Sequence, residues 1–130
     1  MIDVETDVFD SVYQAVHDLF PEGCFTSDYT PAPPALPHAC LKEEDNYTDD
    51  KLQDTADGER FANVLYTANV YAEDKFQCRK LMNAIDTKMQ SLNFRRLSMR
   101  PIDNAADTSI YRIVAQWRGK VNQDKTMFRL

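Results

Sequence analysis

Residues 61–92, FANVLYTANVYAEDKFQCRKLMNAIDTKMQSL, decide the fold of this 130-residue chain. The first part, Phe61–Glu73, alternates with a period of two, which predicts a strand with one buried face. The uniformly apolar positions are Ala62, Val64, Tyr66, Ala68, Val70 and Ala72. The other face is mixed and has aromatic ends. This pattern suits a sheet covered by helices on one side and by another subunit on the other.

The second part of the same stretch predicts a helix. Asp74 is suited to the N-cap, and Gln77 follows three residues later in the capping-box position. Apolar side chains then recur at helical spacing at Cys78, Leu81, Met82, Ile85, Met89 and Leu92. Methionine-rich faces also occur at adaptable binding surfaces, but this spacing favours packing in a core.

The flanking segments supply a second helix and more strands. Residues 4–20 have an amphipathic pattern, with Asp3 as the expected N-cap and Pro21 as a stop. Further strands are expected at Cys24–Tyr29, His38–Leu41, Phe94–Arg100 and Ile110–Val121, with a proline-rich connection between the first two. The order predicts one α+β domain over residues 1–130, with two helices packed on one face of a mostly antiparallel sheet.

Two segments fall outside this core pattern. Residues 42–60, KEEDNYTDDKLQDTADGER, are rich in carboxylates and predict a long protruding acidic loop or hairpin arm. The loop is either simply solvated or orders against a neighbouring subunit; it lacks the spacing of a calcium loop. Residues 122–130 form a turn and a tail that is either frayed or donated as a strand to a partner. The candidate docking residues are Met127, Phe128, Arg129 and Leu130.

Charge is divided unevenly along the chain. Residues 1–60 contain three basic and fifteen acidic side chains, whereas residues 61–130 contain twelve basic and six acidic ones. The overall net charge of −6 argues against general binding to DNA or to anionic membranes. The division favours a ring of identical subunits, because the acidic part of one copy can face the basic part of the next.

The candidate subunit-interface residues follow from this division. They are the basic Arg95, Arg96, Arg100, Arg112, Arg118 and Lys120, and the acidic Glu43, Glu44, Asp45, Asp49 and Asp50. Two other interpretations of the basic residues stay open. One is a solvated sheet face, and the other is a DNA contact, although few aromatic side chains are interleaved with the arginines.

No catalytic or metal-binding signature is present. Phosphate-binding loops and the motifs of hydrolases and metalloproteases are absent. Cys24, Cys40 and Cys78 are expected to be reduced, and His38 near Cys40 lacks the further ligands of a zinc site. We therefore expect no enzyme activity and no cofactor. The acidic start MIDVETDVFD lacks a secretory signal, and no apolar run could span a bilayer, so synthesis in a cytoplasm is expected.

Three segments resemble the small tail-terminator, or tail-completion, proteins of long-tailed bacteriophages. They are DVFDSVYQAVHDLFPEGCFTSDYTPAPPALPHACLKEEDN (7–46), ERFANVLYTANVYAEDKFQCRKLMNAID (59–86) and LNFRRLSMRPIDNAADTSIYRIVAQWRGKVNQDKTMFRL (92–130). The first has an opening helix, a proline-rich connection and a polar loop. The second has a long strand running into a helix, and the third has a terminal hairpin with an IYR-x-x-A-x-[WY]-R strand. The resemblance covers nearly the whole chain.

The resemblance implies a structural role in the virion. Such proteins form rings, typically hexameric, that cap the tail tube, stop its polymerisation and present a docking surface to the head–tail connector. The partners implied are copies of the chain itself, tail tube protein and neck proteins, with DNA only passing through the lumen and no membrane. The alternatives are a head-closure adaptor or a tail assembly chaperone, and more remotely a small enzyme or regulatory domain.

Overall fold

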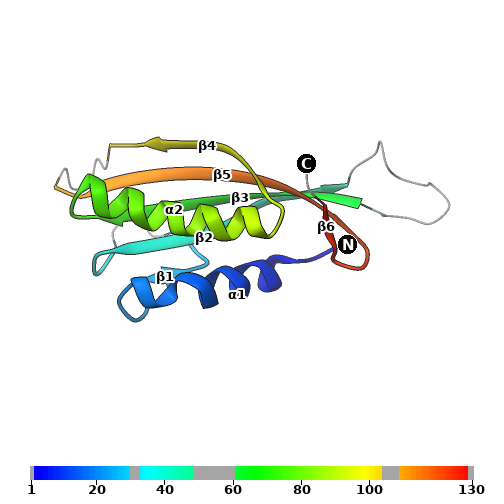
Figure 1. The fold of residues 1–130 in the computed structure, drawn as a ribbon, viewed down its shortest axis with the longest axis horizontal. Helices are drawn as coiled ribbons and strands as arrows, with labels where there is room; N and C mark the ends of the chain where they lie inside the picture. The colour runs from blue at the N-terminus through cyan, green and yellow to red at the C-terminus, as the bar shows by residue number, and fades with distance from the viewer. Residues whose placement is uncertain (1, 30–32, 49–60, 104–108, 129–130) are drawn as a thin grey trace.

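The computed structural model of the chain describes residues 2–29, 33–48, 61–103 and 109–128. Within these ranges, six strands form one sheet in the order β1-β2-β3-β5-β4, with β6 paired to β5. Two α-helices pack on one face of it (Figure 1). The elements are α1 (Glu5–Val16), a 3-10 turn (His17–Leu19), β1 (Phe25–Thr26), β2 (His38–Thr48), β3 (Phe61–Ala72), α2 (Lys75–Ser91), β4 (Arg95–Pro101), β5 (Tyr111–Asn122) and β6 (Met127–Phe128). The α+β prediction is confirmed.

The central strand β3 carries the core. It is antiparallel to β2 on one side and to β5 on the other, and its predicted apolar positions are all buried. Trp117 on β5 lies directly opposite Tyr66, and both are almost completely buried beneath the helices. The predicted division of β3 into a covered apolar face and a mixed face is therefore confirmed.

Helix α2 follows the prediction closely. The Gln77 backbone N–H donates to Asp74 Oδ1 at 2.8 Å, so the expected cap is present. The predicted apolar stripe is buried from Cys78 to Met89, and Leu92 packs against the core from its edge. Asp86 lies among these residues as a buried carboxylate. None of the helices in the described ranges is long and apolar enough to cross a membrane.

Helix α1 differs from the prediction at both ends. The N-cap is Val4, which makes no side-chain cap, so the assignment of Asp3 was wrong by one position. Asp3 Oδ1 instead accepts the Glu5 backbone N–H at 3.1 Å. The α-helical hydrogen bonding stops at Val16, and the expected last turn is a 3-10 segment.

The acidic segment does not begin as a loop. Strand β2 continues to Thr48, because residues 42–48 pair with β3 from Thr67 to Ala62. A bulge at Glu44 lets the strand cross a change of register between Glu43 and Asp45. The prediction of a loop over 42–60 was therefore wrong for residues 42–48, and residues 49–60 lie outside the described ranges.

The tail also belongs to the sheet. Met127 and Phe128 pair antiparallel with Val121 and Lys120 of the same chain. Asn122 organises the turn between them, because its side-chain oxygen accepts the backbone N–H groups of Asp124 and Thr126. The expectation that residues 127–128 are frayed or donated to a partner was wrong, since their own sheet provides the pairing.

Candidate functional site

The most exposed edge of the sheet is basic. Strand β4 forms this edge, and most of its side chains are exposed, including Arg95 and Arg100. Both lie on the face that the helices leave uncovered, since their register partners Arg118 and Val114 alternate with the buried positions of β5. Charged side chains protect such an edge from indiscriminate strand pairing, and they also select an acidic partner.

Two arginines face each other directly on this surface. Arg95 on β4 is in register with Arg118 on β5, and Lys120 lies two residues further along the same face. Like charges in directly opposite positions destabilise a strand pair unless an anion screens them. Arg118 Nε is also buried without a hydrogen-bond partner among the described residues. We call Arg95, Arg100 and Arg118 the basic edge.

Arg96 does not belong to the basic edge. Its side chain lies on the covered face, where Nη1 donates to Asp86 Oδ2 at 2.7 Å. The same carboxylate accepts Trp117 Nε1 at 2.9 Å and Gln90 Nε2 at 2.8 Å. The predicted grouping of Arg96 with the other arginines is therefore corrected: strand alternation directs it to the covered face, where it joins the polar network around the buried Asp86 carboxylate.

Arg112 is also engaged within its own chain. Its Nε and Nη2 both donate to Asn69 Oδ1, at 3.0 and 2.7 Å. The guanidinium lies 5.5 Å from the ring centroids of both Tyr29 and Tyr71. These contacts hold the segment before residue 30 against the uncovered face, so we assign Arg112 a structural role and not a place on the basic edge.

The opposite edge of the molecule is acidic. Strand β1 pairs only with Ala39 and Cys40, so in the described chain β2 itself forms the edge beyond that point. Glu44 and Asp45 are exposed there. Helix α1, which carries several exposed acidic residues, lies along the same side of the molecule (Figure 1). We call Glu44 and Asp45 the acidic edge. The two other predicted acids, Asp49 and Asp50, lie outside the described ranges.

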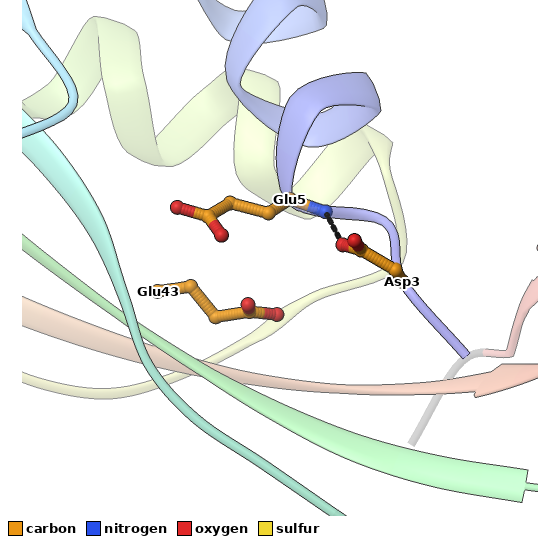
Figure 2. A group of neighbouring side chains, drawn as sticks. All are labelled: Asp3, Glu5 and Glu43. Carbon is orange, nitrogen blue, oxygen red and sulfur yellow. Dashed lines mark hydrogen bonds between the residues drawn. The ribbon is translucent and has the colours of Figure 1, made fainter. Parts of the chain in front are cut away.

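Glu43 is separated from the acidic edge. It is in register with Tyr66 and lies on the covered face, close to Asp3 and Glu5 (Figure 2). Burial, followed by the negative charges of Glu5, Asp3 and Asp45, raises the pKa of Glu43 to about 7. The predicted interface role of Glu43 is therefore not supported by its position, because the side chain points beneath α1.

The raised pKa of Glu43 predicts a pH-dependent stability in metal-free buffer. The folded protein holds the Glu43 proton more tightly than the unfolded chain does, so protonation of Glu43 stabilises the fold. This stabilisation is complete below about pH 4.5 and is lost as the pH rises through about 7. Glu43→Gln should remove the dependence and stabilise the protein at pH 8 by about 1–2 kcal/mol, a value reduced for solvent screening. Urea unfolding at pH 4.5 and pH 8 measures it. An equal pH dependence in both proteins would contradict the prediction.

The described part of the predicted docking tail lies against the core. Met127 packs on the hydrophobic core, while Phe128 is exposed and its ring lies 5.7 Å from that of Phe61. Arg129 and Leu130 lie outside the described ranges. Of the proposed docking residues that are described, Phe128 alone offers a large exposed surface.

The cysteines and His38 are buried in the described chain. All three cysteines are free and buried, as predicted for reduced thiols. Cys78 Sγ donates to the Val70 carbonyl at 3.2 Å, and burial raises its pKa to about 12. Burial also lowers the pKa of His38, which favours the neutral imidazole. A raised pKa makes the Cys78 thiol a weaker nucleophile, since the thiolate is the reactive form.

Neither the family models nor the curated proteins searched gave a match to this chain. Sequence reasoning missed two features, the Asp86 network and the grouping of Asp3, Glu5 and Glu43. Both join residues that are distant along the chain. The first feature alone had a signal in the sequence, because the acidic Asp86 interrupts the apolar stripe of α2.

Proposed function

We propose that this chain is a non-enzymatic ring subunit that acts as a tail terminator of a long-tailed bacteriophage. The observation that carries the proposal is the placement of opposite charges on opposite edges of one sheet. A subunit with one basic and one acidic edge forms a heterologous contact with each neighbour, and such contacts close into a ring when the rotation between neighbours allows it.

The basic edge lacks a negative counter-charge and a hydrogen-bond acceptor, and a neighbouring subunit could provide both. Arg95 and Arg118 repel each other, and Arg118 Nε has no acceptor among the described residues. The carboxylates of Glu44 and Asp45 on a neighbouring copy would supply both the negative charge and the acceptors. Because the edges are exposed, electrostatics would set partner choice and register more than total affinity.

A ring of this kind accounts for the biological role that the resemblance implies. The growing end of a tail tube presents the same subunit surface repeatedly and recruits more tube protein until another protein covers that surface. A ring that complements this surface on one side and presents a different surface on the other stops growth and offers a site for the head connector. None of these steps needs a catalytic residue. The location proposed is the neck of the virion, after synthesis in the host cytoplasm.

The first test is reversal of the basic edge. Arg95→Glu with Arg100→Glu should leave a folded monomer and weaken ring assembly at least about a hundredfold, since like charges would now face each other. Arg96 is left intact because its loss would disturb the core. Light scattering after size exclusion, with negative-stain images of the same fractions, measures assembly.

Two further variants make the test specific. Arg79→Glu with Lys80→Glu changes the net charge equally on the exposed side of α2 and should assemble normally. Glu44→Lys with Asp45→Lys should fail alone but should form mixed rings with the Arg95→Glu and Arg100→Glu protein. Normal assembly of either edge variant alone would contradict closure through these edges.

The terminator role itself is tested with tail tube protein from the same virus. Substoichiometric amounts of the wild-type chain should stop tube polymerisation and appear as a cap at one end of each tube in electron micrographs. The edge-reversed variant should leave tubes of uncontrolled length. Tubes that grow unchanged with the wild-type chain, together with rings that bind the portal side, would show a head-closure adaptor instead.

A further inference from the structure

Three carboxylates converge where the amino-terminal segment meets the sheet. Asp3 precedes α1, Glu5 opens it, and Glu43 extends from β2 beneath it (Figure 2). One oxygen from each residue lies within 4.8 Å of the others. Asp3 and Glu5 are exposed and Glu43 is half-buried, so the group is open to solvent on one side. We call these residues the carboxylate cluster.

A buried tyrosine beside this cluster has a hydroxyl group without a hydrogen-bond partner among the described residues. Tyr66 is 1% exposed, and its hydroxyl makes no hydrogen bond to any described residue. It lies directly across from Glu43 on the covered face of the sheet. After burial, the charges that raise the pKa of Tyr66 are those of Glu43, Glu5, Asp3 and Asp7, in that order. The hydroxyl therefore lies near the carboxylates of the cluster.

The described basic side chains do not balance the charge of the cluster. None of the lysines and arginines in the described ranges pairs with Asp3, Glu5 or Glu43; the exposed ion pair of α1 joins Asp7 to Lys125. Glu43 Oε1 also lacks a hydrogen-bond partner among the described residues. The Tyr66 hydroxyl and Glu43 Oε1 are therefore available to a bound cation or to the water molecules that it holds.

We propose that the carboxylate cluster binds one Ca²⁺ ion, with Asp3, Glu5 and Glu43 as ligands and water completing the shell. Hard carboxylate oxygens favour Ca²⁺ or Mg²⁺ over softer metals. Calcium ligands lie about 2.3–2.6 Å from the ion, so two of them can be about 5 Å apart, whereas Mg²⁺ requires about 4.2 Å or less. The oxygens of this cluster lie within 4.8 Å of one another, so one Ca²⁺ ion could contact all three, and its irregular shell suits such a site better than the near-ideal octahedron that Mg²⁺ demands.

The bound ion would fasten the start of the chain to β2. One protein contact already makes this link, because Asn46 Nδ2 donates to the Ile2 carbonyl at 2.7 Å. The cation would add a second link, from Asp3 and Glu5 to Glu43, and would hold α1 over the sheet. None of the three ligands belongs to the acidic edge, so calcium binding can be tested separately from ring closure.

The test starts from protein stripped of metal with a chelator and then dialysed. Titration calorimetry with CaCl₂ at pH 7.5 should show one site with a Kd of about 10⁻⁴–10⁻³ M, the range of partly exposed carboxylate sites. Saturating Ca²⁺ should raise the unfolding midpoint by about 4–8 °C. Mg²⁺ at the same concentration should give less than half of that shift.

The decisive variant is Asp3→Asn with Glu5→Gln, which keeps the shape of both side chains. It should abolish calcium binding and the calcium-dependent shift while the metal-free protein remains folded. Asp10→Asn with Asp18→Asn is the matched control, because it removes two exposed charges from the same part of the chain outside the cluster, and it should bind as the wild type does. A calcium shift that is equal in the cluster variant and the wild type, or absent in the wild type up to 10 mM, would overturn the proposal.

Discussion

Replacing Asp86 by alanine should lower the free energy of unfolding by about 2–4 kcal/mol. The side chain is 9% exposed and accepts three hydrogen bonds, from the Arg96 guanidinium, the Gln90 amide and the Trp117 indole. Alanine removes all three acceptors at once. Urea unfolding followed by circular dichroism measures the loss.

The indole contributes most of this cost. Trp117 is completely buried, so its Nε1–H would be left without a partner in an apolar surrounding. Arg96 is 42% exposed at its side chain and can turn toward water, which limits its share. Gln90 is exposed and can do the same.

Two controls separate the network from helix propensity. Asn83→Ala changes an exposed position of the same helix and should alter stability by less than about 0.5 kcal/mol. Asp86→Asn keeps an acceptor for the indole and should cost about half as much as alanine. Trp117 is the sole tryptophan, so its fluorescence reports directly on the site. Unchanged stability and unchanged emission in the alanine variant would contradict the assigned network.

Local patterns predicted the parts of the fold that local physics determines. The alternation from Ala62 to Ala72, the Asp74 cap and the stripe on α2 each depend on spacing within one element, and all three are confirmed. The extension of β2 to Thr48 was not predictable in this way. Its charged residues have low strand propensity, and they are extended because β3 pairs with them.

The candidate site shows the same division between local and long-range effects. The sequence revealed that charge is split, but strand alternation and register decided which arginines reach the edge. Arg96 contacts Asp86 and Arg112 contacts Asn69, so neither belongs to the basic edge. The carboxylate cluster joins positions 3 and 5 to position 43 through tertiary packing, which no spacing rule anticipates.

The placement of the remaining charges makes the ring proposal more specific than the sequence did. Residues of the basic edge come from β4 and β5, and those of the acidic edge come from β2, with β3 between them. Opposite charges therefore lie across the width of one sheet instead of on its two faces. Neighbouring subunits would then meet side by side, leaving the helical layer and the uncovered sheet face for other partners.

The second large effect is expected at Gly119, where alanine should destabilise the protein by about 1–3 kcal/mol. Alanine in place of glycine normally stabilises a strand by roughly 0.5–1 kcal/mol, so the sign of the change is itself informative. A β-carbon here would lie 2.6 Å from the Phe94 ring and 2.7 Å from the Met127 methyl group, both far closer than packed carbon atoms allow.

The destabilisation arises because one of the two neighbouring side chains cannot easily move. Met127 is flexible and can move, but the Phe94 ring also packs edge-on against Tyr66, with centroids 5.3 Å apart. Phe94→Leu should therefore relieve much of the strain, and the double variant should be less destabilised than the sum of the single ones by at least about 0.5 kcal/mol. Because Met127 belongs to β6, Gly119→Ala should also increase amide hydrogen exchange at residues 127–128. The prediction would be contradicted if Gly119→Ala stabilised the protein, or if the effects of the two substitutions on the free energy of unfolding were strictly additive. Either result would show that the Phe94 ring does not need the space that Gly119 leaves.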